Sequence, residues 1–272
     1  LRPDRDDDFL ITGKRHDFLV DYDVGFDDTG RIEGLDVMLA SRCGYSVDLS
    51  GPVNDRAVMH VDNCYFLENL RVVSHRCRTN TQSATAFRGF GGPQGMMAVE
   101  NVIDDIARRL KLDPLAVREA NFYVPGSRDL TPYEMKVEDF IADDLASQLA
   151  KEADYRARRA RICAWNRGSG NLKRGIALIP VKFGISFTAT HLNQAGALVH
   201  VYTDGSVLLN HGGTEMGQGL VIKEAHVVAE EPGIGRDKGM LPKAWSLSGD
   251  GLNFFLDLVE ATSPWPSPPE EE

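Results

Sequence analysis

The glycine-rich run at residues 86–95, AFRGFGGPQG, constrains the fold of this chain more than any other feature of its sequence. Four glycines fall within residues 89–95, and glycine allows tight turns and a close approach of the backbone to another group. Pro93 then opens a helical pattern, since proline is favoured at the first helical positions. Such a loop offers N–H groups and the positive end of the helix dipole to an anionic ligand, and Arg88 adds a guanidinium. The alternative is a loop that needs glycine only for its turns, with its phenylalanines in the core.

The composition is that of an ordinary globular protein. The chain has 272 residues, enough for one or two domains, with 42% hydrophobic and 26% charged residues. Its net charge of −10 and the lack of a basic stripe exclude nucleic acid as the main partner. No apolar run reaches membrane-spanning length and the first residues do not resemble a signal peptide. We therefore expect no membrane partner and a cytoplasmic location.

The cysteines and histidines do not predict a metal site. The four cysteines contain no CxxC pair, so neither a zinc site nor an iron–sulfur cluster is expected, and they are predicted to be free thiols in a reducing compartment. The seven histidines show no HExxH or clustered carboxylate pattern and are expected to be structural. Glu215 lies in a second glycine-rich loop, and we expect a structural role for it as well.

Hydrophobic periodicity predicts a hairpin and then helices in the first part of the chain. Residues 18–40 alternate as two strands around a turn at 28–30, with Gly34 as a bulge. A helix follows the glycine-rich loop and ends near Leu110. A second helix begins at Asp113-Pro114 and ends near Asn121. Residues 124–134 read as a surface loop, and 138–165 as a charged helical region.

The second part of the chain reads as strands followed by a helix. Residues 166–171 form a polar linker, and 174–180 are expected to be a strand. Residues 197–202 and 207–210 predict a hairpin around a Thr-Asp-Gly-Ser turn. A second glycine-rich loop at 211–219 leads into a helix. The fold class is therefore α+β, with mixed sheets and helices, and each part has a glycine-rich loop before a helix.

The glycine-rich blocks resemble those of a known family. Residues 85–94, TAFRGFGGPQ, are similar to the signature of the molybdenum-binding subunit of xanthine dehydrogenases. Further blocks occur in the same order along the chain, at residues 62–65 (DNCY), 182–188 (KFGISFT), 193–197 (NQAGA) and 212–219 (GGTEMGQG). The resemblance covers residues 1 to about 231.

The resemblance implies an incomplete pair of molybdopterin-binding domains. Residues 1–165 are expected to form the first molybdopterin-binding segment and residues 172–231 the start of the second. Residues 232–272 look unrelated and of low complexity, and a disordered or frameshifted tail is expected there, although a genuine tail that docks another subunit is an alternative.

The resemblance also implies a molybdenum–molybdopterin cofactor held between the two segments. Phe87 and Arg88 correspond to positions at the molybdenum end, and Gly217 and Gln218 to positions that hydrogen-bond the cofactor. The metal itself would be held through the pterin dithiolene, so no protein ligand to the metal is expected. Without the resemblance, Gln218 would read as an ordinary surface amide.

The family's substrate is a flat heterocycle, and three positions match its binding residues. Phe90 and Phe187 correspond to the two aromatic rings that enclose the substrate. Arg56 corresponds to a catalytic and substrate-binding arginine that faces the purine's oxygen, where negative charge develops. Aldehyde oxidases generally lack this arginine, so its presence favours purines. The alternative for Arg56 is a surface arginine paired with Asp55 or Asp62.

The implied reaction is the oxidation of hypoxanthine and xanthine to urate, with water as the oxygen source. Iron–sulfur clusters and FAD are expected in other domains or subunits of the same enzyme, which are the expected partners together with the purine. The family's catalytic glutamate matches no position of this chain, so the isolated chain is expected to be inactive. A non-catalytic remnant and an aldehyde oxidase-like subunit are the alternatives.

Overall fold

The chain folds into two units that are described separately. The computed structural model describes residues 2–187, 189–204, 207–215 and 217–230. The first unit comprises Leu1–Gly184 and the second Ile185–Glu272. The tail predicted at 232–272 lies outside the described residues. The limits of the two molybdopterin-binding segments, at 1–165 and 172–231, stay predictions.

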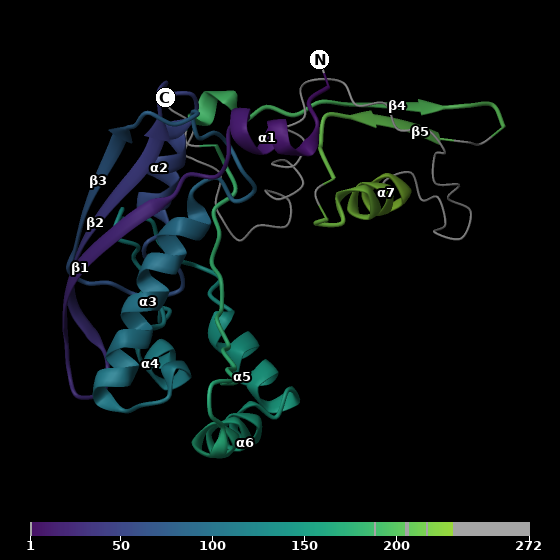
Figure 1. Cartoon of the computed structure of the whole chain (residues 1–272). Helices are drawn as coiled ribbons and strands as arrows, with labels where there is room; N and C mark the ends of the chain where they lie inside the picture. Colours follow the sequence, from purple (N-terminus) through teal and green to yellow (C-terminus); the bar gives the residue numbers. More distant parts are fainter. Residues whose placement is uncertain (1, 188, 205–206, 216, 231–272) are drawn as a thin grey trace. The chain divides into compact units, whose positions relative to one another are not determined.

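The first unit contains a three-stranded mixed sheet (Figure 1). Strands β1 (Phe18–Phe26) and β2 (Ile32–Gly44) form the predicted antiparallel hairpin. The register shifts between Gly25 and Phe26, which leaves Glu33 as an extra residue beside the predicted bulge at Gly34. Strand β3 (Leu70–Arg78), which the sequence did not predict, pairs parallel to β2.

Six helices accompany this sheet: α1 (Arg5–Ile11), α2 (Ser50–Met59), α3 (Gly92–Leu110), α4 (Pro114–Asn121), α5 (Ala142–Glu152) and α6 (Tyr155–Gly168). The predicted helices after the glycine-rich loop and after Asp113 are confirmed. The Asp113 carboxylate caps α4 by accepting from the Leu115 N–H at 2.9 Å. The helical region expected at 138–165 is two helices, because Asp154 takes a left-handed conformation between them.

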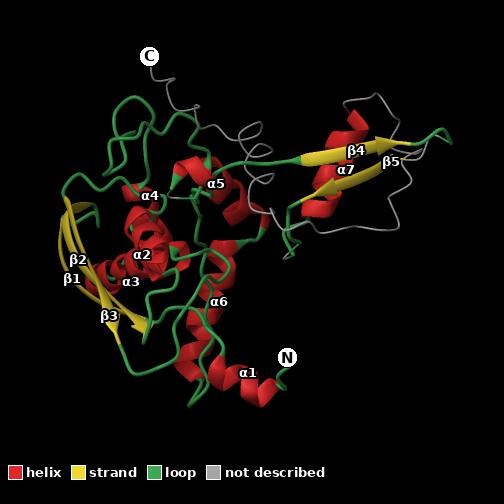
Figure 2. Cartoon of the chain, turned by 90° about the horizontal axis from the view of Figure 1, so that it is seen from above, coloured by secondary structure: helices red, strands yellow, loops and turns green. Residues whose placement is uncertain are grey.

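The core of the first unit lies between one face of the sheet and helices α2 and α3. Figure 2 shows the sheet curving around these helices. Leu39 and Val37 on β2 and Val99 and Ile103 on α3 are at most 1% exposed. Burial of apolar side chains on this single face accounts for the alternating pattern that predicted β1.

The prediction of a strand at residues 174–180 is wrong. These residues run extended but join no ladder. Side chains rather than a neighbouring strand hold the end of this segment, as described below.

The described part of the second unit is a hairpin followed by a helix. It contains the 3₁₀ turn η1 (Thr190–Leu192), antiparallel strands β4 (Ala197–Val201) and β5 (Val207–His211), and helix α7 (Leu220–Glu230). The hairpin and the helix after the second glycine-rich loop were both predicted. Both units mix helices and sheets, so the α+β fold class is confirmed. Within the described ranges, no helix has the length and apolar character needed to span a bilayer.

Candidate functional site

The glycine-rich loop turns sharply into α3 through consecutive left-handed residues. Gly89, Phe90 and Gly91 have φ angles of +91°, +50° and +95°. Phe90 lacks the freedom of glycine, and a non-glycine residue in this region is uncommon outside sites where the surroundings enforce it. The loop therefore fixes the position of the half-buried Phe90 side chain.

Three glycines of this loop are required by contacts with the protein itself. A Cβ added at Gly91 would overlap the Val53 carbonyl, and one at Gly95 would overlap the Ala57 carbonyl, both on α2. A Cβ at Gly92 would lie 2.5 Å from the Phe183 ring. The close approach expected for a ligand is thus made here by α2 and Phe183, and this part of the sequence interpretation is corrected.

Phe87 and Arg88 lie on the outer side of the same loop, next to Arg15. Phe87 is 54% exposed, and the Arg15 guanidinium carbon lies 4.4 Å from the centre of its ring. Arg15 Nη2 donates to the Arg88 carbonyl at 2.5 Å, while its buried Nη1 has no acceptor among the described residues. Burial lowers the pKa of Arg15. An orphaned guanidinium nitrogen is a donor that suits an anionic group.

Arg56 extends from α2 and lies next to two aromatic rings. Its guanidinium carbon lies 5.7 Å from the Phe90 ring centre and 5.5 Å from the Phe183 ring centre, and Nη1 donates to the Gly184 carbonyl. Arg56 is only 5% exposed, and burial lowers its pKa. The sequence alternative of a surface arginine is therefore wrong.

The two carboxylates considered as partners of Arg56 have other cationic partners. Asp55 pairs with Arg76, and Asp62 pairs with Lys182 at 2.7 Å.

His60 connects α2 to the segment that carries Phe183. The Gly184 N–H donates to His60 Nε2 at 3.0 Å, so Nδ1 carries the proton and donates to the Arg56 carbonyl at 2.8 Å. Burial lowers the pKa of His60 to about 4, which keeps the ring neutral. Sequence reasoning missed Phe183 and Lys182 as contributors to this region, although both lie in the KFGISFT block that it singled out.

In the second unit, the N-terminus of α7 is already occupied by a carboxylate of the chain. Glu215 accepts from the N–H groups of Gly217, Gly219 and Val221 at 2.7, 3.1 and 3.2 Å. These hydrogen bonds lower the pKa of Glu215 against the opposing effect of desolvation. The structural role expected of Glu215 agrees with these contacts, since its carboxylate caps the start of α7.

The other predicted residues of the second unit also make local hydrogen bonds. Gln218 Nε2 donates to the Thr214 carbonyl at 2.8 Å. The Phe187 backbone pairs with the Asn193 amide at 2.9 and 3.1 Å. The proposed cofactor and substrate roles of these residues stay predictions.

A buried pair that the sequence did not predict links β5 and α7. His211 Nε2 lies 2.5 Å from Glu224 Oε2, and the Gly213 N–H donates to His211 Nδ1 at 3.0 Å. Burial, with a smaller contribution from Glu215, raises the pKa of Glu224 to about 7. This pair packs the second glycine-rich loop against its own helix.

The structure thus groups Arg56, Phe87, Arg88 and Phe90 around the start of α3 in the first unit. Phe187, Gly217 and Gln218 belong to the second unit, and each group is described by itself. No cluster of three or more histidine, cysteine or acidic side chains within the described ranges could hold a metal ion. The expectation that no side chain of the protein binds the metal directly stays a prediction.

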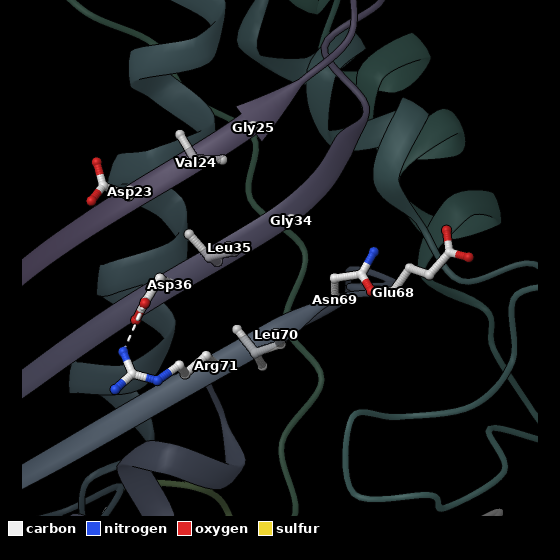
Figure 3. Close-up of a pocket in the computed structure, with 10 residues that line it drawn as sticks. All are labelled: Asp23, Val24, Gly25, Gly34, Leu35, Asp36, Glu68, Asn69, Leu70 and Arg71. Carbon is white, nitrogen blue, oxygen red and sulfur yellow. Dashed lines mark hydrogen bonds and ion pairs between the residues drawn. The ribbon is translucent and has the colours of Figure 1, made fainter.

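A surface depression of about 800 Å³ lies elsewhere on the first unit (Figure 3). It lies over the paired stretches Asp23–Gly25 and Gly34–Asp36 of the hairpin and Glu68–Arg71 at the start of β3. The Arg71–Asp36 ion pair, at 2.7 Å, crosses it. The depression is open and contains none of the predicted site residues.

Comparison with protein families gives two matches, both to molybdopterin cofactor-binding domains. The first match covers residues 1–122 and the second covers residues 148–238. Among solved structures, the chain is similar to aldehyde oxidoreductase from Desulfovibrio desulfuricans, with a TM-score of 0.66 and 22% identity over 87% of this chain and 25% of that chain. It is also similar to CO dehydrogenase from Oligotropha carboxidovorans, with a TM-score of 0.64 and 19% identity over 92% and 33% of the two chains. At these identities the structural likeness shows the fold.

Relatives found by sequence have a higher identity to the chain than these solved structures have. The chain is 50% identical over 235 residues to xanthine dehydrogenase/oxidase from Gallus gallus, and 48% identical over 229 residues to nicotinate hydroxylase from Emericella nidulans. These matches cover 86% and 84% of the chain and 17% of each relative's length. The chain belongs to the molybdopterin cofactor-binding domain family and is a partial homologue of the xanthine dehydrogenases.

Proposed function

We propose that the chain contributes to the molybdenum–molybdopterin site of a hydroxylase that oxidises hypoxanthine and xanthine to urate, with water as the oxygen source. The observation that carries the proposal is the buried Arg56 guanidinium beside the rings of Phe90 and Phe183. A fixed cation next to aromatic surface suits a flat heterocycle that carries an oxygen. The xanthine dehydrogenases that are 50% identical to the chain over the matched residues support the same substrate class.

In the proposed reaction, Phe90 stacks on the purine and Phe187 supplies the second ring. Stacking orients the flat heterocycle. Arg56 stabilises the negative charge that develops on the purine oxygen during attack on the ring, and a cation held in place beforehand is more effective there than a mobile one. The hydrogen bond from Arg56 Nη1 to the Gly184 carbonyl ties the guanidinium to the backbone of the neighbouring segment.

The residues of the first unit fit an anionic, flat cofactor. The orphaned Arg15 Nη1 and the exposed Phe87 ring offer a donor and an apolar surface, and Arg88 lies next to both. We propose that Phe87 and Arg88 hold the molybdenum end and that Gly217 and Gln218 exchange their present hydrogen bonds for bonds to the cofactor. When bound, the cofactor supplies the two-electron oxidation and the activation of water.

The remaining elements of the proposal concern the surroundings of this chain. Iron–sulfur clusters and FAD in other domains or subunits accept the electrons, and those parts are its proposed partners. A cytoplasmic location is proposed with them, which the four free thiols support because such thiols persist in reducing compartments.

One relative suggests a second candidate substrate. Nicotinate hydroxylase from Emericella nidulans is nearly as similar to the chain as the xanthine dehydrogenases are. A guanidinium beside aromatic rings also suits a heteroaromatic carboxylate. Nicotinate is therefore the substrate to test against xanthine.

The test uses the chain assembled with the rest of its hydroxylase, assayed with xanthine, nicotinate and an aromatic aldehyde. We expect xanthine oxidation, and a fall in kcat/KM of about 10²–10³-fold in Arg56→Met because a charge-stabilising donor is lost. Arg71→Met, which breaks an exposed ion pair of the same unit, is the matched control and should change nothing. Oxidation of nicotinate or aldehyde but not xanthine, or full xanthine activity in Arg56→Met, contradicts the proposal.

A further inference from the structure

The DNCY block at residues 62–65 has no role in the proposed function. Its second residue, Asn63, nevertheless has an uncommon combination of full burial and a left-handed backbone. Asn63 is fully buried in a left-handed conformation, with φ +41°. Its side-chain amide accepts from the Lys182 N–H and donates to the Pro180 carbonyl, both at 3.1 Å, and donates to Glu100 at 2.9 Å. A single side chain thus replaces a neighbouring strand for the extended segment 180–182.

Asp62 fixes the same segment through its side chain. The Asp62 carboxylate is 2% exposed and accepts from Lys182 Nζ and from the Tyr123 hydroxyl, both at 2.7 Å. Lys182 Nζ also donates to the Tyr133 hydroxyl at 3.3 Å. Burial opposes the charge on Lys182, but Asp62 and Tyr133 raise its pKa above the ordinary value. A buried charge that loses its partner is strongly unfavourable, so this pair holds Lys182 firmly.

The two residues that follow Lys182 both contact Arg56. The Phe183 ring packs against Gly92 and lies 5.0 Å from the His60 ring. The Gly184 carbonyl accepts from Arg56, and its N–H donates to His60. A displacement of Lys182 therefore moves both the ring and the carbonyl that the Arg56 guanidinium contacts.

We propose that Asp62 and Asn63 are positioning residues that fix the segment 180–184 and, through Phe183 and Gly184, hold the Arg56 guanidinium in a single orientation. The part of this inference that concerns purine oxidation rests on the proposed function. The part that concerns the orientation of Arg56 does not.

The first experiment uses NMR on the chain itself to measure how fast the backbone amide hydrogens and the Arg56 Nη–H hydrogens exchange with water. Asn63→Gly removes the amide while tolerating the left-handed backbone. The double variant Asp62→Asn/Lys182→Met removes both charges, so that no buried charge is left unpaired. In both variants, we expect the Gly184 amide and the Arg56 Nη–H hydrogens to exchange about tenfold faster, the scale of one or two lost hydrogen bonds. The Val37 amide in β2 should be unchanged, as should all these signals in the control Arg71→Met.

The second experiment measures xanthine oxidation by the assembled hydroxylase carrying the same variants. We expect kcat/KM to fall about tenfold with molybdenum content unchanged, since the cation remains present but less well oriented. Unchanged exchange at Gly184 and Arg56 in both variants overturns the proposal. Faster exchange everywhere in the first unit also overturns it, because that result indicates a general loss of stability. If the assembled wild type oxidises no purine, the proposed function fails, and the exchange data alone decide the orientation of Arg56.

Discussion

At the scale of single residues, the start of α3 depends on glycines that face protein rather than ligand. Gly91 and Gly95 let α3 approach the backbone of α2, the helix that carries Arg56. The motif therefore places Phe90, in the turn before α3, near Arg56 by bringing α3 and α2 together. Close packing of this kind tolerates little added volume.

Gly95→Ala should destabilise the first unit by more than about 2 kcal/mol, because its Cβ would overlap the Ala57 carbonyl oxygen, which belongs to the backbone and cannot swing away. Gly51→Ala is the matched control on α2, since nothing lies within 4 Å of an added Cβ there. That variant should be neutral or stabilised by up to about 1 kcal/mol. Urea unfolding followed by circular dichroism measures both. Equal effects of the two substitutions would contradict this account of the motif.

The neutral state of His60 predicts a pH dependence of stability. Its pKa in the folded chain is about 4, below the ordinary value of 6.5, so the unfolded chain takes up the proton first as the pH falls. The contribution is present above about pH 6.5 and is lost toward pH 4. Between pH 7 and pH 5 it should amount to about 2 kcal/mol.

Urea unfolding of the wild type and His60→Gln at both pH values measures this contribution. The free-energy difference between the two proteins should shrink by about 2 kcal/mol on going to pH 5. The exposed His75, changed to Gln, serves as the control and should follow the wild type. A difference between wild type and His60→Gln that does not change with pH would rule out the neutral ring.

The environment of Arg56 could not be predicted from the sequence alone. The family resemblance singled out the residue, but Gly184, which binds its guanidinium, lies 128 positions away. Local patterns carry no information about such a contact. The same holds for Asn63, whose partners at Pro180 and Lys182 are brought near only by the fold.

At the scale of elements, the prediction succeeded where periodicity and capping act locally. The hairpin β1–β2, helix α3 and the Asp113 cap of α4 follow from alternation, apolar spacing and an N-cap before proline. Strand β3 was missed because its burial does not alternate and its pairing with β2 is parallel and distant in sequence. The strand expected at 174–180 failed because extended residues found side-chain partners instead of a ladder.

Asp113 does more than cap α4, which gives a prediction at this scale. Its carboxylate also lies 2.9 Å from Arg159 Nε and accepts from the Tyr155 hydroxyl at 3.1 Å, both on α6. Asp113→Ala should therefore destabilise the first unit by about 2 kcal/mol, about 1 from the cap and the rest from the link to α6. Asp4→Ala removes the cap of α1, a helix with no buried residues, and should change global stability by less than about 0.5 kcal/mol. Thermal unfolding measures the loss of stability in both variants. If Asp113→Ala cost no more stability than Asp4→Ala, the proposed link from Asp113 to α6 would be wrong.

At the scale of the whole molecule, the chain matches two molybdopterin cofactor-binding domains, and it has two glycine-rich loops that each precede a helix. The loops differ in chemistry. Next to the first loop, the buried Arg15 Nη1 has no acceptor among the described residues, whereas in the second loop Glu215 already occupies the helix N-terminus. The central claim, that this chain binds the molybdenum–molybdopterin cofactor, therefore rests more on the first unit than on the second.

The most direct test is the molybdenum and pterin content of the chain purified after co-expression with cofactor-synthesis proteins. We predict stoichiometric molybdenum and pterin, their loss in Arg88→Glu, where a carboxylate replaces the guanidinium, and their retention in Arg71→Glu on β3. A full-length xanthine dehydrogenase loaded in the same cells verifies the supply of cofactor. Absence of both molybdenum and pterin from the wild-type chain under those conditions would contradict the claim.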